Sequence, residues 1–361
     1  MKPLGAAAWP LALLYGAGVT LFRKGYEVGL RGRQTFPLPV ISVGNIEAGG
    51  TGKSPLVVAL CQQFFRSGIR VGVVSRGYGR TRSRENRLIC RGEGLLVPVE
   101  QAGDEPALLA AKVPGVRISV AADRREGIRL LEGLCDLVIL DDGFQSLEIL
   151  PTLSLVFLPE ILFQRRPGIG DLLPAGPLRE LPEVLSRATH WILRRTESFS
   201  GVPTGREETL QKNLRAMLGE EGMRPILPVD FRLFRIRDFA GRQAHPVDSL
   251  SGRTVAVVAG IANPQRIVRD LEAFGSRVAG LLALPDHAPE TPEVRGTIAE
   301  FAREMHSRGA EILLTTEKDR IKWTQCPEGP LPVFVLEGET RFLDTNAWDR
   351  ILSLPFHGSA P

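Results

Sequence analysis

The stretch AGGTGKSPLV, residues 48–57, contains the residue types from which a phosphate-binding loop is built. Glycines let backbone N–H groups turn towards a phosphate, while a lysine reaches the β- and γ-phosphates and the hydroxyl after it binds Mg²⁺. The usual pattern begins with a glycine, and here that position is Glu47. We predict a nucleotide site made of Gly49, Gly50, Thr51, Gly52, Lys53 and Ser54, with Lys53 also acting in catalysis.

The segments on either side favour this interpretation. Residues 38–44 (LPVISVG) are short, apolar and rich in β-branched side chains, as in a buried strand, and residues 54–65 have apolar side chains at helical spacing. Pro55 lies just inside the expected helix start, where a missing N–H costs nothing. The glycines therefore lie between a strand and a helix, where the positive end of the helix attracts phosphate. The alternative is a glycine-rich turn with an exposed lysine.

A second set of polar residues follows the apolar run LCDLVIL of residues 134–140. Asp141 and Asp142 end this strand, and ligands of doubly wound sheets bind beyond the carboxyl ends of the strands. Either carboxylate, directly or through water, can hold Mg²⁺ together with Ser54. The alternative is an acidic turn that caps the next segment.

Two further pairs of polar residues can each be explained in more than one way. Asp104 and Glu105 precede an apolar helical run, where capping of the helix is the simpler explanation for at least one carboxylate. Asp286 and His287 follow a strand in a proline-bounded loop, where a histidine suits proton transfer near neutral pH. A solvated loop histidine explains the second pair equally well.

Strand-like and helical runs alternate along most of the chain, which predicts an α/β fold with a mostly parallel sheet covered by helices on both faces. The rhythm stops near residue 200, where the sequence becomes polar and rich in turns, and residues 231–252 are predicted to be irregular or ribbon-like. It resumes near residue 254. A chain of 361 residues exceeds the usual size of one core, so we expect an N-terminal segment (1–35), a phosphate-loop domain (36–225) and a smaller α/β domain (226–361).

The composition is that of an ordinary globular protein, with 43% hydrophobic and 24% charged residues and a net charge of +4. Such a charge suits an anionic substrate or a membrane surface. No Lys/Arg-rich run is interleaved with aromatic residues, so nucleic-acid binding is not expected. The scattered cysteines, without C-x-x-C spacing, indicate reduced thiols in the cytoplasm and no zinc site: Cys61, Cys90, Cys135 and Cys326.

Residues 3–22 carry no charge, and basic residues bracket them on both sides: Lys2, Arg23, Lys24, Arg31 and Arg33. We predict an apolar helix that lies in the inner-leaflet interface of a membrane and meets anionic headgroups. The length also allows a spanning helix, although Pro10 and the small residues weaken that alternative. A core helix of the first domain is another alternative, and no small-residue cleavage site supports a signal peptide.

Further motifs join those above, and all occur in this order along the chain: VGNIEAGGTGKS, SRGYGR (75–80), GDEP (103–106), the Asp123–Arg124 pair, DDGFQ (141–145), LLPAGPLRE (172–180), GIANP (260–264), PDH (285–287) and TTEKD (315–319). Their combination and order resemble the tetraacyldisaccharide 4′-kinase family, which makes lipid IVA in lipid A biosynthesis. The resemblance covers residues 40–320.

The resemblance implies transfer of the γ-phosphoryl group of ATP, with Mg²⁺, to the 4′-hydroxyl of a membrane-embedded tetraacyldisaccharide 1-phosphate. It also implies a two-lobed phosphate-loop fold with the site in the cleft between the lobes, and a monomer is expected. Asp104 resembles the proposed base towards the sugar hydroxyl, supported by His287, which reverses the capping preference. Glu105 joins Ser54, Asp141 and Asp142 as a metal ligand. Arg124, Arg179 and Glu180 are the expected substrate contacts, although either arginine also suits a surface ion pair.

Two residues depart from the family pattern. Ser146 stands where a histidine usually follows DDGFQ, and Ala288 stands where many members have a second histidine. Glu47 is no departure, because the loop of this family also lacks the first glycine. The main alternative is a membrane-associated ATPase switch. Proteins of that class have an additional lysine just before the paired glycines, whereas this chain has Ala48 at that position. A GTP-dependent metal chaperone would need an N-K-x-D segment and Cys/His ligands, which are absent.

Overall fold

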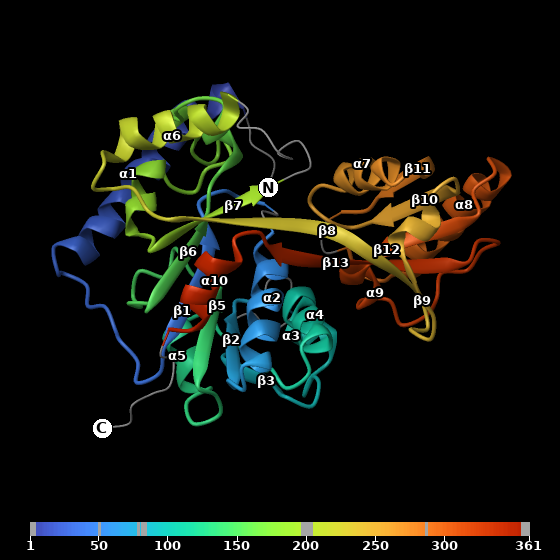
Figure 1. Cartoon of the computed structure of the whole chain (residues 1–361), viewed down its shortest axis with the longest axis horizontal. Coiled ribbons are helices and arrows are strands. Elements are labelled where there is room, and N and C mark those ends of the chain that lie inside the picture. Colours follow the sequence, from blue (N-terminus) through green and yellow to red (C-terminus); the bar gives the residue numbers. More distant parts are fainter. Residues whose placement is uncertain are drawn as a thin grey trace.

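The computed structural model describes residues 5–49, 52–77, 80, 85–195, 205–285 and 288–354. Figure 1 shows two lobes joined by long strands. The strands of the first lobe are β1 (Val40–Asn45), β2 (Val71–Ser75), β3 (Arg87–Arg91), β4 (Arg117–Val120), β5 (Leu137–Asp141), β6 (Leu153–Phe157) and β7 (His190–Arg195). They lie in the order β7-β6-β1-β5-β2-β4-β3 and are parallel except for β3. The predicted parallel sheet is confirmed, and β3 is a strand that the sequence pattern did not reveal.

Helices cover both faces of this sheet, which explains why β1, β2, β5 and β6 are buried along their whole length. One face packs against α2 (Lys53–Arg66) and α4 (Asp104–Lys112), with the short α3 (Val99–Ala102) directly before α4. The other face packs against α5 (Arg124–Arg129) near its centre, and against α1 (Trp9–Glu27) and α6 (Gly205–Leu218) near β6 and β7. The carboxyl ends of the parallel strands therefore share one edge, where the site lies.

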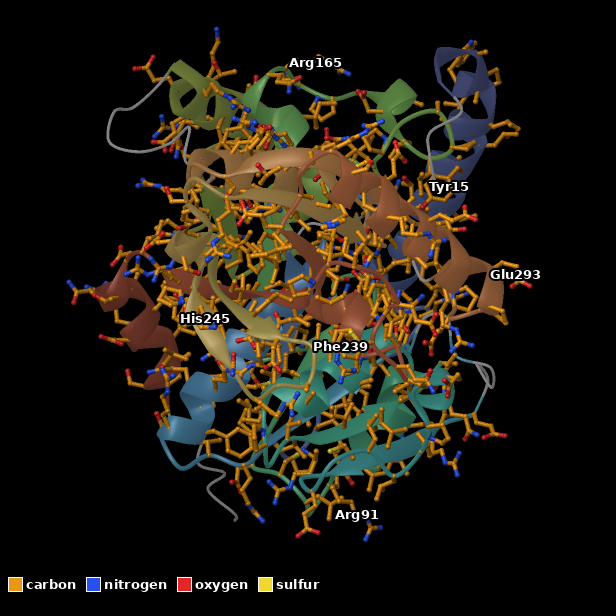
Figure 2. The ribbon with its side chains drawn as sticks, turned by 90° about the vertical axis from the view of Figure 1, so that its right-hand side faces the viewer. Tyr15, Arg91, Arg165, Phe239, His245 and Glu293 are labelled. Carbon is orange, nitrogen blue, oxygen red and sulfur yellow. The ribbon has the colours of Figure 1, made fainter. Side chains whose placement is uncertain are left out.

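The second lobe continues the same sheet. Its strands are β8 (Ile226–Asp238), β9 (Ala244–Pro246), β10 (Thr254–Ala259), β11 (Arg277–Ala283), β12 (Ile312–Thr316) and β13 (Val333–Phe342), with helices α7 (Gln265–Ala273), α8 (Pro292–Ser307) and α9 (Glu317–Arg320). In the described residues, thirteen strands form one sheet, and β8 joins the lobes by pairing with β7 at its start and with β13 along its length. The ribbon-like prediction for residues 231–252 corresponds to β8 and its antiparallel partner β9. Figure 2 looks at this lobe from its outer side, with Phe239 near the centre.

The last helix, α10 (Thr345–Leu352), packs against the first lobe, as the red helix in Figure 1 shows. Trp348 and Ile351 belong to the same buried cluster as the residues of α2. The indole of Trp348 lies 4.3 Å from the ring of Phe342 and donates a hydrogen bond to the Pro228 carbonyl, at 3.4 Å. The sequence boundary that placed all of residues 226–361 in the second lobe is therefore wrong for this helix.

α1 lies on the surface of the first lobe with most of its apolar side chains exposed. Only Ala12 of the helix is buried, whereas Leu14 is 69% and Leu21 is 74% exposed. This exposure rules out the alternative of a core helix. Among the described residues, no helix has the length and apolar character needed to cross a membrane.

Candidate active site

The phosphate loop connects the end of β1 to the start of α2, as the sequence predicted. Gly52 is the N-cap of α2 and has φ +94°, a left-handed conformation that glycine adopts without strain. Gly49 also has a positive φ, of +120°. Lys53 and Ser54 are the first two residues of the helix, so their side chains start beside its free N–H groups. Gly50 and Thr51 lie outside the described residues.

Lys53 faces the acidic end of β5 in this structure. Its Nζ lies 3.4 Å from Oδ1 of Asp142 and donates a hydrogen bond to Oδ1 of Asn45, at 3.2 Å. Arg179 pairs with the other oxygen of Asp142, at 2.8 Å from its Nη1. Burial would raise the pKa of Asp142, but the charges of Lys53 and Arg179 outweigh burial and lower this pKa below its ordinary value. Asp142 is thus an anion held between two cations.

Asp142 also has an unusual backbone, because its φ of +53° lies in the left-handed region. Aspartate tolerates this region better than most residues, but the conformation still costs energy and is concentrated at functional sites. Asp142 directly follows the buried strand β5, and its backbone conformation turns its side chain towards Lys53.

Asp141 is buried at the last position of β5. Burial, together with the negative charges of Glu105 and Asp142, raises the pKa of Asp141 to about 7. Oγ of Ser75 lies 3.5 Å from its Oδ2. Glu105 is the second residue of α4, so its negative charge acts on Asp141 from the start of that helix.

The residues at this edge fit the expected Mg²⁺. The negative charges of Glu105 and Asp142 raise the pKa of Asp141, and a divalent cation would relieve this concentrated negative charge. Among the described residues no group of three or more His, Cys, Asp or Glu is arranged to hold a metal ion. Magnesium in phosphate-loop sites takes only one or two carboxylates and completes its shell with water and phosphate oxygens, so a closed cage is not required.

Arg124 lies inside the protein and not on its surface. Its side chain is fully buried at the start of α5, and its Nη2 donates a hydrogen bond to the backbone carbonyl of Asp141, at 2.6 Å. The surface ion pair is therefore wrong for Arg124. Its observed contact positions the strand end that carries the two aspartates.

Arg179 and Glu180 lie at this edge together with residues that sequence reasoning missed. Gln145 donates hydrogen bonds to the Asn45 carbonyl, at 2.9 Å, and to Glu180, at 3.3 Å. Arg187 pairs with the buried Glu180 carboxylate, at 3.2 Å. Gln145 belongs to the DDGFQ motif and was a visible signal, whereas nothing in the local sequence marked Asn45 or Arg187.

Asp104 is the first residue of α4, and Gly103 is the N-cap, with no side-chain capping bond. A capping role for Asp104 is therefore not observed. Its Oδ2 lies 3.9 Å from Nζ of Lys322, which belongs to the second lobe and also lies 3.0 Å from Asp319. At the other end of α4, Lys112 pairs with Glu317, at 2.7 Å. α4 thus contacts the second lobe through ion pairs at both ends.

The TTEKD and GIANP motifs meet at Asp319, which is completely buried. Its Oδ2 accepts hydrogen bonds from the Gly260 N–H, at 2.9 Å, and from the Thr316 hydroxyl, at 2.7 Å. A side chain at Gly260 would meet Asp319 at 2.7 Å, which explains the glycine. Asp286 and His287 lie outside the described residues. Pro285, the described residue before them, has its carbonyl oxygen 3.2 Å from the Cβ position of Gly260.

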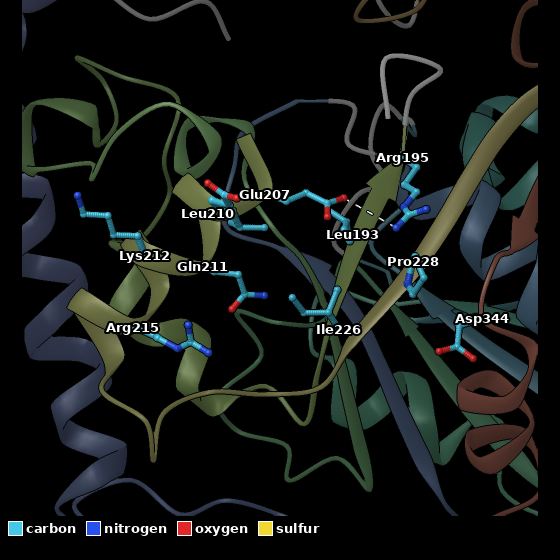
Figure 3. A pocket seen from close by; sticks show the side chains of 11 residues that line it. Leu193, Arg195, Glu207, Leu210, Gln211, Lys212, Arg215, Ile226, Pro228 and Asp344 are labelled. Atoms are coloured by element: carbon cyan, nitrogen blue, oxygen red, sulfur yellow. Dashed lines mark ion pairs between the residues drawn. The ribbon is translucent and has the colours of Figure 1, made fainter. Parts of the chain in front are cut away.

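One surface cavity in the described part of the chain has a volume of about 830 Å³. It lies between α6 and β7 and contains the Arg195–Glu207 pair (Figure 3), but none of the predicted site residues. Another, of about 560 Å³, lies between α1 and residues 169–183. It is mainly apolar and reaches Arg179 and Glu180, so it leads towards the acidic edge.

Comparisons with known proteins agree with this geometry. The sequence model of the family described as tetraacyldisaccharide-1-P 4′-kinase (LpxK) matches residues 4–355. Proteins named tetraacyldisaccharide 4′-kinase from Pelobacter propionicus and Xanthomonas oryzae pv. oryzae are 34% and 38% identical, with 87% and 89% of this chain and 81% and 84% of theirs covered. The crystal structure of LpxK from Aquifex aeolicus in complex with ATP is 27% identical, with a TM-score of 0.72 over 97% of this chain and 98% of that one. This chain belongs to the tetraacyldisaccharide 4′-kinase family.

Proposed function

We propose that this protein transfers the γ-phosphoryl group of ATP to the 4′-hydroxyl of tetraacyldisaccharide 1-phosphate and so forms lipid IVA. The observation that carries the proposal is the convergence of three elements at one edge of the sheet. α2 brings Lys53, β5 brings the two aspartates, and α4 brings Asp104. A phosphate-binding cation, a metal-binding pair and a candidate base are the parts that phosphoryl transfer to an alcohol requires.

The roles at the donor side follow from the contacts. The loop N–H groups and Lys53 hold the phosphates of ATP, and Lys53 leaves its contact with Asp142 to do so. Mg²⁺, when bound, would be held by Ser54 and by one or two of the carboxylates of Asp141, Asp142 and Glu105, directly or through water, and would neutralise charge on the transferred group. Arg124 holds the backbone at the end of β5 and so fixes the direction of both aspartates.

On the acceptor side, Asp104 takes the proton of the attacking hydroxyl with the support of His287. Lys322 of the second lobe contacts Asp104, so closure of the lobes places the positive charge of Lys322 next to the proposed base. Arg179 and Glu180 contact the sugar or phosphate of the lipid precursor. The apolar cavity between α1 and residues 169–183 is lined at one side by these two residues. It is suited to hold an acyl chain of the lipid precursor next to its headgroup.

The exposed apolar surface of α1 supports attachment to a membrane surface, which we place at the cytoplasmic face of the inner membrane. Arg31 follows α1, and its guanidinium lies over the rings of Phe22 and Tyr26 of that helix, at 4.6 and 5.8 Å from their centroids. Lys24 also lies on α1. Cations beside an apolar surface suit anionic headgroups. The protein acts there as a monomer attached at the surface.

The test is transfer of label from γ-labelled ATP to detergent-solubilised tetraacyldisaccharide 1-phosphate with Mg²⁺. Lys53→Ala and Asp104→Ala are expected to lose at least a hundredfold in kcat. Lys212→Ala and Asp349→Ala make the same charge changes at exposed positions and serve as matched controls that retain activity. Hydrolysis of ATP by folded protein without labelled lipid would refute the kinase and favour the ATPase switch.

A further inference from the structure

Arg194, near the end of β7, lies against the phosphate loop, although no motif marked it. Its Nη1 is 3.8 Å and its Cδ 3.9 Å from the position that a Cβ on Gly52 would occupy. Successive residues of a strand point to opposite faces, and Ile192 packs in the cluster that contains α2. Arg194 therefore projects on the α2 face, directly beside the N-cap of that helix.

Among the described residues, no carboxylate balances the charge of Arg194. Within the described residues its Nε is buried without a hydrogen-bond partner, and no carboxylate forms an ion pair with its guanidinium. The other cations near the loop differ, because Lys53 and Arg179 share Asp142. A cation beside the positive end of a helix is unfavourable, and a partly buried cation without a partner is more so, unless an anion binds there.

The order of the strands indicates which part of the nucleotide this anion is. β5, with Asp141 and Asp142, lies on one side of β1, whereas β7 lies on the other side, beyond β6. A Mg²⁺ held by Asp141 and Asp142 would lie next to the transferred phosphate, so that phosphate is expected to face the acidic side. The opposite side is left for the phosphates that remain on the nucleotide.

We propose that Arg194 binds the α- and β-phosphates of ATP, the phosphates that are not transferred. Its planar guanidinium can donate two parallel hydrogen bonds to phosphate oxygens, which a lysine cannot do. The inference rests on ATP as the donor and makes no assumption about the acceptor. It adds a nucleotide contact from a strand that otherwise serves as scaffold.

The experiment compares Arg194→Met and Arg194→Lys with Arg195→Met in the full chain. Arg195 carries the same charge on the same strand, but faces α6 and pairs with Glu207, at 3.8 Å, as Figure 3 shows. Dissociation constants for ADP and AMP are measured by calorimetry without lipid, and kcat and KM are measured in the kinase assay. Arg194→Met is expected to weaken ADP binding at least tenfold and to raise the KM for ATP similarly, with kcat changed less than threefold. Arg194→Lys should lose less, and Arg195→Met should equal the wild type.

Several outcomes would overturn the inference. Unchanged ADP affinity in folded Arg194→Met would refute the inference. A fall in kcat alone would also refute it, because the contact would then be to the transferred phosphoryl group. A rise in the KM for the lipid with ADP binding intact would assign Arg194 to the lipid phosphate instead. If Arg194→Met does not fold, wild-type ADP affinity and KM in Arg194→Lys would refute the bidentate contact. Weaker ADP binding in a protein that phosphorylates no lipid would retain the inference and reject the kinase.

Discussion

Replacing Asp142 with Asn removes the anion that two cations share at the phosphate loop. Lys53 and Arg179 would then face each other without a carboxylate between them, each with most of its side chain covered. The nucleotide-free protein should lose stability because the two positive charges repel. Metal-free ADP should bind more tightly, since its phosphates no longer compete with Asp142 for Lys53.

The magnitude follows from the contact distances. At an effective dielectric constant of about 20, charges at 3.4 and 2.8 Å attract by roughly 5 and 6 kcal/mol before desolvation is subtracted. Breaking a buried pair costs about 3 to 5 kcal/mol and breaking an exposed pair costs less than about 1 kcal/mol. The side chains of Lys53 and Arg179 are 13% and 24% exposed, so we expect a loss of about 2 kcal/mol, or a few degrees in Tm.

The assay measures Tm and ADP affinity in EDTA and again in Mg²⁺. In EDTA, Asp142→Asn should bind ADP on the order of tenfold more tightly than wild type; in Mg²⁺ the order should reverse, because a metal ligand has been lost. Asp136→Asn is the matched control, since Asp136 pairs with Arg70 before the start of β5, at the opposite end from Asp142. ADP affinity in EDTA that is unchanged or weaker in Asp142→Asn would refute the view that Asp142 holds Lys53 away from phosphate.

Three further predictions concern other parts of the chain. Burial raises the pKa of Glu47 from 4.5 to about 7, so its neutral form contributes stability that is complete below pH 4.5 and lost as the pH rises through 7. Glu47→Gln should therefore be more stable than wild type by about 2 kcal/mol at pH 8.5 and by little at pH 4.5, measured by urea unfolding; equal differences at both pH values would contradict this. Trp348→Ala should cost about 3 to 5 kcal/mol in the same measurement, because the indole is buried in the first-lobe core, and a cost below about 1 kcal/mol would reject that packing. Replacing Leu14 and Leu21 with Asp should reduce sedimentation with anionic vesicles at least tenfold, whereas Leu130→Asp, at an exposed residue outside α1, should not; equal effects would argue against α1 as the membrane contact.

The local parts of the site could be predicted because they depend on residues that are neighbours in the chain. A short β-branched run, glycines and a helix with Lys53 at its start can form only a few backbone geometries, and the structure has the expected one. The end of β5 at Asp141 was visible for the same reason, since an apolar strand stops where carboxylates begin. The family resemblance then joined these separated motifs into one function, which the comparisons support.

The contacts between distant residues could not be predicted in this way. The sequence left residues 231–252 open between irregular and ribbon-like structure, because the alternating Phe, Leu, Arg and Asp of β8 are only partly buried and its regularity comes from pairing with β13 about a hundred residues later. α10 packs on the first lobe because Trp348 and Ile351 are buried in the core of that lobe. No local sequence pattern indicates this contact.

The sequence by itself determined which chemical groups are present at the ends of β1 and β5 and at the start of α4, because strand, turn and helix formation depend on nearby side chains. Only the tertiary structure decided which charges meet. The sheet order brings Lys53 and Arg179 to Asp142 and places Arg194 beside Gly52, and the packing of the lobes brings Lys322 to Asp104. Electrostatic energy depends on distances in space, and these are set by topology, which the spacing along the chain does not record.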